Sequence, residues 1–169
     1  DILGTTKIDQ TSGVWVDGQY LGFVKELKGD KKILLLPGDH EIAVRQAGYI
    51  DQVQKVTIEP GKTTTITVSM QKDPKAMFPT GPTSEVKLKV TPDRAAVFVD
   101  GVYAGTPQEF GGHWHTMVIA PGQHHVRIAL AGYQDFTTEI NLRPHQKITI
   151  KTDLIPGSIT QASPAIKSN

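Results

Sequence analysis

The sequence predicts an all-β protein built from two tandem, small antiparallel β-sandwiches. The first indication is a repeat: the stretch VWVDGQYLG, which begins at Val14, returns 83 residues later as VFVDGVYAG from Val97. The second is that apolar and polar residues alternate over short segments, as they do in half-buried strands. The third is that glycine and proline turns separate these segments, while no amphipathic pattern of about ten residues or more predicts a helix.

The repeat extends over the length of a whole domain. Asp17-Gly18 matches Asp100-Gly101 at an offset of 83, and after the gain of one residue the later motifs match at an offset of 84. A stretch with three prolines lies between the two copies and is typical of an extended linker. We therefore expect four parts: a first domain of residues 1–70, a linker of residues 71–84, a second domain of residues 85–154 and a C-terminal tail of residues 155–169.

Within each copy the strands follow one another between recognisable turns. The first copy opens with the strand around Trp15, and the second shows clear alternation in VKLKV (86–90), VRIAL (126–130) and KITIKT (147–152). Alternate residues of such a segment lie on one face, so we expect one apolar face of each strand in a core. The strands end at Asp-Gly, Pro-Gly or Ala-Gly-Tyr, and we expect Pro121-Gly122 to centre a hairpin.

The Asp-Gly pairs are the strongest hairpin signals in the chain. A tight two-residue turn needs positive φ angles, which glycine favours and aspartate tolerates. A calcium site would need several more oxygen ligands, and no Asp-rich loop supplies them. We therefore interpret eight residues as structural turns: Asp17, Gly18, Pro37, Gly38, Asp100, Gly101, Pro121 and Gly122.

The order of these motifs resembles the PEGA domain family. Each copy contains a strand, VDG, a further glycine, PGxHxV, AGY and a final hairpin bounded by proline. The resemblance covers most of residues 1–70 and 85–154, with LPGD at Leu36–Asp39 and APGQ at Ala120–Gln123 in place of the Pro-Glu-Gly-Ala tetrapeptide. It implies small all-β modules, immunoglobulin-like or prealbumin-like, that occur in extracytoplasmic and surface proteins of bacteria and archaea.

Composition excludes several classes of protein. The 169 residues, 38% of them hydrophobic, suffice for two small cores. The net charge of +1 gives no field that would attract nucleic acid. There is no cysteine, and no apolar run reaches the roughly 20 residues of a membrane span. The opening DILGTTKIDQ lacks the regions of a signal peptide, so we expect the targeting segment of an exported product to lie outside this sequence.

The histidines of the second copy raise the question of a metal site. His113 and His115 flank Trp114. On a strand both imidazoles would lie on one face, an arrangement in which they could bind the same zinc ion. If the Pro-Gly turn centres a hairpin, however, His115 lies opposite Ile128, several residues from the histidines that follow the turn. We therefore expect no metal and no cofactor. The histidines that we expect to be mostly neutral and exposed, near one end of the second sandwich, are His113, His115, His124 and His125.

Two histidines occupy the same place in both copies. His40 and His124 follow the Pro-Gly turn, and we interpret them as structural residues of that turn or of the adjoining strand. No serine lies in a nucleophile-elbow pattern, and no glycine-rich loop leads into a helix that could bind phosphate. We therefore expect that the protein is not an enzyme.

Aromatic residues are the remaining candidates for binding. Trp15 and Phe98 are equivalent, and each lies between two valines. If the valines point into the core, both rings lie on the opposite face of their sheets. There they either stack on a ligand or are covered by a neighbouring strand or the linker, and we favour the second alternative. The candidate binding residues are Trp15, Phe98, His113, Trp114 and His115.

From these observations we expect a non-catalytic, extracytoplasmic module of a cell-envelope or surface protein, in the periplasm or on the cell surface. Its partners would be an envelope protein or a glycan, unless it acts as a spacer, and it would bind no nucleic acid. The alternative is an accessory part of a metal-dependent hydrolase that uses the histidines of the second copy. Such a hydrolase needs at least three converging ligands and an open coordination position.

Overall fold

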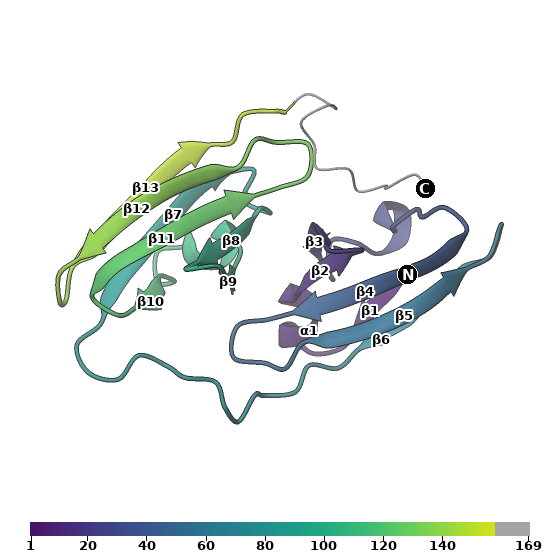
Figure 1. The fold of residues 1–169 in the computed structure, drawn as a ribbon, viewed down its shortest axis with the longest axis horizontal. Coiled ribbons are helices and arrows are strands. Elements are labelled where there is room, and N and C mark those ends of the chain that lie inside the picture. The colour runs from purple at the N-terminus through teal and green to yellow at the C-terminus, as the bar shows by residue number, and fades with distance from the viewer. Residues whose placement is uncertain (158–169) are drawn as a thin grey trace. The chain divides into compact units, whose positions relative to one another are not determined.

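The computed structural model describes residues 1–157 (Figure 1). The described residues divide into two compact units, which we call the first module (residues 1–74) and the second module (from residue 75 onward). Residues 158–169, most of the expected C-terminal tail of residues 155–169, lie outside the described part. In the described part, no helix has the length and apolar character needed to cross a membrane.

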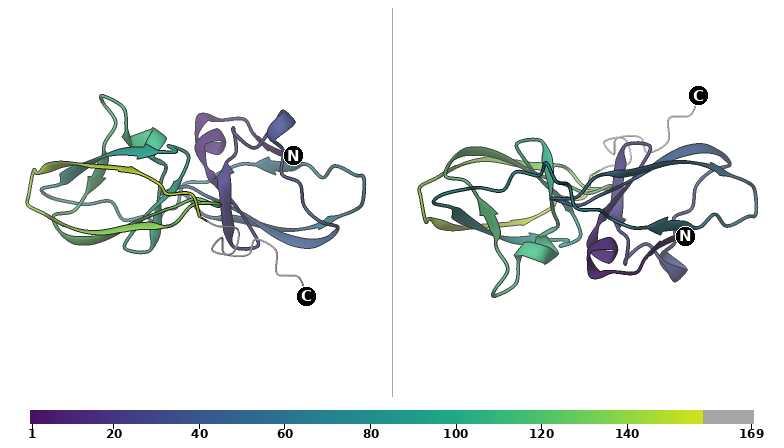
Figure 2. Two further views of the ribbon diagram at one scale, coloured as in Figure 1. Left: turned by 90° about the horizontal axis from the view of Figure 1, so that it is seen from above. Right: turned by 90° about the horizontal axis from the view of Figure 1, so that it is seen from below.

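The first module contains two sheets of unequal size (Figures 1 and 2). The larger sheet has the strand order β3-β2-β4-β5 and is antiparallel throughout. The smaller sheet is formed by β1 and β6 alone, which run parallel with Ile2 opposite Ile66. In chain order the elements are β1 (Ile2–Gly4), α1 (Lys7–Thr11), β2 (Gly13–Val16), β3 (Gln19–Phe23), the 3-10 helix η1 (Gly29–Lys31), β4 (Gly38–Arg45), β5 (Gln52–Ile58) and β6 (Ile66–Val68).

The second module has the same plan with a fuller second sheet. Its larger sheet has the order β12-β11-β8-β9, and the smaller one has the order β10-β7-β13. In the smaller sheet, β7 pairs antiparallel with β10 and parallel with β13. In chain order the elements are β7 (Ser84–Thr91), β8 (Ala96–Val99), β9 (Val102–Gly105), α2 (Pro107–Phe110), β10 (Met117–Ile119), β11 (Gly122–Ala129), β12 (Phe136–Leu142) and β13 (Lys147–Asp153).

Alternation along the strands fills each core, as the sequence predicts. Along β7, for example, Val86, Leu88 and Val90 are buried while the lysines between them are not. Val14 and Val97, which are equivalent, are both fully buried. Each side chain of this kind contributes about 1.5–3 kcal/mol when it is removed from water. The all-β fold of two tandem sandwiches is therefore confirmed, and the two α-helices of the described part have only five and four residues.

The repeat is also visible in the contacts that close each sandwich. Tyr49 forms an isolated bridge with Lys72, and Tyr133 forms the same bridge with Pro156, again at an offset of 84. Each tyrosine belongs to an Ala-Gly-Tyr motif. The motif thus attaches the start of β5 or β12 to the chain that leaves the last strand of the module.

Two expectations about connections are wrong. Pro121-Gly122 does not centre a hairpin, because β10 and β11 belong to different sheets and Ile128 lies opposite Val97 and Phe136 instead of His115. The proline-bounded final hairpin is also absent, because β12 and β13 lie in different sheets and β13 pairs in parallel with β7. Turn residues show where a strand ends, whereas the sheet that the next strand joins depends on burial of its apolar face against distant segments.

Candidate functional site

In the first module, the turn motifs join in one hydrogen-bonded cluster. Asp17 and Gly18 connect β2 to β3 with φ angles of 49° and 82°. The Asp17 carboxylate accepts a hydrogen bond from the Glu41 backbone N–H at 2.9 Å and contacts Nδ1 of His40 at 2.7 Å. The other ring nitrogen of His40 lies 2.9 Å from the carbonyl oxygen of Leu36. His40 therefore connects the hairpin turn to the segment that enters β4.

The second module repeats this cluster contact by contact. Asp100 accepts a hydrogen bond from the His125 backbone N–H at 2.9 Å, and its other oxygen lies 2.7 Å from Nδ1 of His124. Nε2 of His124 lies 2.8 Å from the Ala120 carbonyl oxygen. The motif residues of both copies are thus engaged in holding turns. His124 had been expected to be exposed, and this is wrong, because its side chain is only 14% exposed.

Electrostatics favours the charged forms in the first cluster. The hydrogen bond from His40 is the main cause that lowers the pKa of Asp17. Burial opposes it, and the hydrogen bond from the Glu41 N–H adds a smaller lowering effect. The pKa of His40 is raised, first by its hydrogen bond to Asp17 and then by that to the Leu36 carbonyl. Since both ring nitrogens face acceptors, the imidazolium form satisfies both contacts. In the second module, the hydrogen bond from His124 likewise lowers the pKa of Asp100.

Trp15 belongs to a packed cluster on the outer face of the larger sheet. It is only 3% exposed, and its ring lies 5.1 Å from that of Tyr20. The Arg45 guanidinium lies 4.8 Å from the ring centroid and binds the Asp51 carboxylate at 3.0 Å. One face of the indole is therefore occupied by a cation, an arrangement that contributes about 0.5–2 kcal/mol.

Phe98 has the same surroundings in the second module. Its ring lies 6.0 Å from Tyr103, and the Arg127 guanidinium lies 4.2 Å above it and binds Asp135 at 2.9 Å. Arg127 lies directly opposite Phe98 on the neighbouring strand, whereas Arg45 lies opposite Gly13 and reaches Trp15 diagonally. Arg45 and Arg127 thus come from positions that are not equivalent in the repeat, yet each places a guanidinium over the equivalent aromatic ring. This supports a packing role for the aromatic residue.

The loop between α2 and β10 holds the most exposed candidate. His113, Trp114 and His115 are all exposed, and Trp114 is 87% exposed. They lie outside any strand, so the alternation assumed for the two histidines does not apply. The His113 ring contacts Trp114 edge to face at 5.4 Å between centroids. This loop has no counterpart of the same sequence in the first module, where LKGDKK occupies the equivalent residues 27–32.

The histidines of the second module have separate environments. His124 contacts Asp100, and His125 contacts Glu139 at 2.9 Å on the neighbouring strand. His113 and His115 lie in the loop before β10. Among residues 1–157, no group of three or more histidine, aspartate or glutamate side chains has an arrangement that could hold a metal ion.

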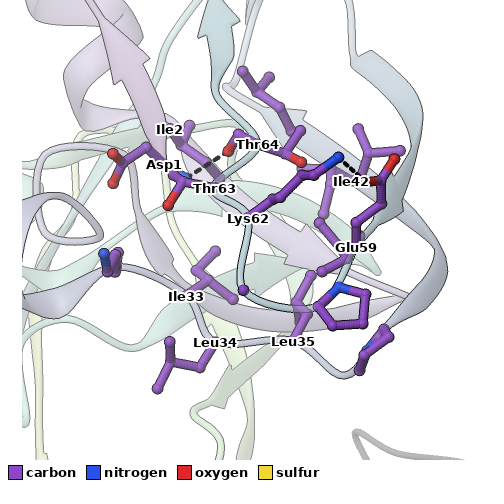
Figure 3. Close-up of a pocket in the computed structure, with 17 residues that line it drawn as sticks. Asp1, Ile2, Ile33, Leu34, Leu35, Ile42, Glu59, Lys62, Thr63 and Thr64 are labelled. Atoms are coloured by element: carbon purple, nitrogen blue, oxygen red, sulfur yellow. Dashed lines mark hydrogen bonds and ion pairs between the residues drawn. The ribbon is translucent and has the colours of Figure 1, made fainter.

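The first module also contains a groove that the sequence did not reveal. It has a volume of about 360 Å³ and lies between the segment that leads into β4 and the segment that leads into β6. Figure 3 shows Ile33, Leu34 and Leu35 on one side of it and Thr63 and Thr64 on the other. The lining is mainly apolar, while lysine and glutamate side chains lie at its rim.

Asp9 is a second residue that sequence reasoning missed. It is 3% exposed, and its carboxylate accepts hydrogen bonds of 2.9 Å from the backbone N–H groups of Thr6 and Met70. Burial alone would raise the pKa of Asp9, but these N–H donors outweigh it and the pKa is lowered. The pattern Thr-x-x-Asp is a helix-capping signal, which was overlooked because α1 is too short for a helical period.

Comparison with known proteins identifies the repeat. The model of the PEGA domain matches this chain twice, at residues 9–74 and 83–158. No curated protein matches the chain. Among solved structures, the chain is similar to the Bacillus anthracis TIE protein, with 16% sequence identity and a TM-score of 0.31. That match covers 90% of this chain, which spans only 33% of the TIE protein chain.

Proposed function

Because the chain belongs to the PEGA domain family, we propose that it is a non-catalytic, extracytoplasmic contact module of a cell-envelope or surface protein. PEGA domains are generally found in extracytoplasmic proteins, which supports the periplasm or the cell surface as the location. The chain either mediates contacts with an envelope protein or a glycan or acts as a spacer, and we favour the contact role.

The observation that carries this proposal is that the residues repeated in both modules have structural roles, whereas the exposed Trp114 is not repeated. In both modules, the shared aspartate and histidine hold the same turn, and the shared aromatic ring packs against tyrosine and arginine. These contacts, which both copies share, give the motif aspartate, histidine and aromatic residue a structural role in each module. Trp114, in contrast, is highly exposed and belongs to a loop whose sequence is not repeated in the first module.

Trp114 has the properties of a contact residue. Tryptophan combines a large apolar surface with few rotatable bonds, and it is enriched among residues that dominate binding energies. Its ring can stack on a sugar or fill a pocket in a protein. His113 and His115 beside it provide hydrogen-bonding groups at the edge of the same surface.

The test compares wild type with Trp114→Ala in pull-downs from envelope extract and on a glycan array. We expect Trp114→Ala to lose about tenfold or more of the binding to whichever partner is found, with an unchanged fold by circular dichroism. Phe78→Ala, which removes another exposed aromatic ring, is the matched control and should bind like wild type. Equal binding by wild type and Trp114→Ala would refute the contact role of this loop.

A further inference from the structure

We propose that the outer face of the smaller sheet of the second module binds an acidic polysaccharide, a glycan whose sugar units carry carboxylates. This surface, which we call the lysine face, presents Lys87 and Lys89 from β7 and Lys151 from β13. The inference rests on the proposed function and deepens it, because it names the class of glycan and places a charged surface beside the loop of Trp114.

The register of the sheet brings these lysines together. Alternate residues of β7 are buried in the core, so Lys87 and Lys89 point away from it. The parallel pairing of β7 with β13 places Lys151 directly opposite Lys89, and Thr149 opposite Lys87. Neighbouring strands lie about 4.8 Å apart, and alternate residues of one strand about 6.6 Å apart. Three ammonium groups can therefore reach the same anionic chain.

The charge of the lysine face is not neutralised within the module. Glu85, at one end, is already bound by Lys147 at 3.0 Å, and Asp153 lies at the other end of β13. Among residues 1–157, the three lysines of the face form no ion pair. Like charges directly opposite one another destabilise a sheet, so folding alone does not favour Lys89 beside Lys151.

Protection of a sheet edge does not explain these lysines either. Lysine often blocks an exposed edge strand, but β7 is the middle strand of the order β10-β7-β13. In the first module, Leu3 lies opposite Thr67 at the positions equivalent to Lys89 and Lys151. The same sheet pairing thus forms without these charges, which are a property of the second module.

The loop that carries Trp114, residues 111–116, runs beside the lysine face. At the end of the loop, the Thr116 hydroxyl donates to the Glu85 carboxylate at 3.0 Å. At its start, Gly111 lies against β7, where an added Cβ would be 2.8 Å from the Leu88 carbonyl oxygen. Both ends of the loop therefore contact β7, and the exposed Trp114 belongs to the segment between these two contacts.

This combination of groups matches a charged sugar polymer. Each lysine ammonium is a point charge that can bind one carboxylate, as Lys147 binds Glu85 on the same sheet. The indole of Trp114 supplies an apolar surface on which a sugar ring can stack. A glycan with one carboxylate on each sugar unit presents single charges in a row, as the lysine face does. A neutral glycan would use the indole alone.

The test measures binding of oligogalacturonate, which has one carboxylate on each unit, to the whole chain by isothermal titration calorimetry. We expect a Kd of about 1 mM or lower that rises with ionic strength, because salt screens the exposed lysines. The methyl-esterified oligosaccharide has the same sugars without the charges. It should bind about fivefold more weakly.

Two double variants locate the binding site. Lys89→Gln combined with Lys151→Gln should weaken binding of oligogalacturonate about fivefold. The urea midpoint of this variant should be unchanged or higher, because a repulsion is removed, whereas a structural role of the lysines would lower it. Lys28→Gln combined with Lys55→Gln removes the same charge from exposed positions of the first module and should bind like wild type.

Four results would overturn the proposal. They are no binding at about 1 mM oligogalacturonate, equal binding of the methyl ester, equal binding by the Lys89 and Lys151 double variant, and equally effective displacement by duplex DNA of the same charge. The last result would show a site for any polyanion.

The same titrations separate this inference from the proposed function. If Trp114→Ala weakens binding of the charged and the esterified glycan alike, while the Lys89 and Lys151 double variant binds both like wild type, the proposed function stands and this inference fails. If the double variant loses binding and Trp114→Ala does not, the lysine face binds the glycan and the contact role of Trp114 fails.

Discussion

At His40, an acceptor faces each ring nitrogen, and this links stability of the first module to pH. The raised pKa of His40 means that its contribution is fully present below the unfolded value of about 6.5 and is lost as pH rises through the folded pKa. The lowered pKa of Asp17 means that its contribution is present above its unfolded value of about 3.9 and is lost as pH falls. The pair therefore stabilises most between about pH 4 and 6.5.

We expect His40→Gln to destabilise the first module by about 1 kcal/mol more at pH 5.5 than at pH 9, because the charged hydrogen bond exists only at the lower pH. The expected difference in stability is small because the Asp17 side chain is 39% exposed and solvent screens the pair. Urea unfolding followed by Trp15 fluorescence, in a Trp114→Phe background, measures this difference. His113→Gln serves as the control. An effect of His40→Gln that does not change with pH would contradict the assignment.

The turn glycines give a second prediction at the scale of single residues. Gly101 has a φ of 81°, and a Cβ added there would meet no atom within 4 Å, so any cost of substitution comes from the backbone. We expect Gly101→Val to lose about 2 kcal/mol, because a β-branched residue is strained at positive φ. Gly101→Asn should lose less than about 1 kcal/mol, since asparagine tolerates this conformation. Equal unfolding midpoints for the two variants would argue against the strain.

Among the elements, α1 depends on a single buried carboxylate. Asp9 caps the helix through Thr6 and also accepts the N–H of Met70, which follows β6. We expect Asp9→Ala to destabilise the first module by about 2 kcal/mol, because it removes the acceptor of the partly buried hydrogen bonds from the Thr6 and Met70 N–H groups. Thr6→Ala, which removes only the cap, should cost about 1 kcal/mol. Chemical denaturation of both variants gives the comparison, and similar losses would show that the contact with Met70 contributes little.

The connections between elements are where prediction from sequence reached its limit. Alternation identified β7, β11 and β13, and the Asp-Gly motif located two hairpins. The same alternation is compatible with either sheet, so the Pro-Gly turn before β11 was read as a hairpin although it crosses between sheets. The parallel pairing of β13 with β7 joins distant segments and leaves no local pattern. Likewise, Ile33–Leu35 and Met117–Ile119 have similar sequences, yet only the second segment forms a strand.

Across the whole molecule, the two modules share motifs but differ in how completely they are built. The cluster of Asp17 and His40 could be foreseen as structural because it recurs at Asp100 and His124. The exposure of Trp114 could not be foreseen, because a single tryptophan in a loop has no sequence pattern that distinguishes a buried packing residue from an exposed binding residue. The pairing within the smaller sheets could not be foreseen either: β7 has eight residues between two partners, whereas β1 has three residues and one partner.

This difference predicts the order in which the intact chain unfolds. The second module buries Met117, Ile119 and Leu142 where the first leaves their equivalents half-exposed, and its smaller sheet contains more backbone hydrogen bonds. Each module has its own core, so we expect two transitions rather than one. The first module should unfold at a lower urea concentration, because burial of apolar surface and strand pairing provide most of the stability of a small sandwich.

Urea unfolding of Trp114→Phe, observed by fluorescence and by circular dichroism, tests this order. The fluorescence then reports only Trp15, which is buried in the first module, while circular dichroism reports the strands of both modules. We expect the Trp15 signal to change entirely within the first of two dichroism transitions. A single transition with coincident signals would mean that the modules unfold as one unit in spite of their separate cores.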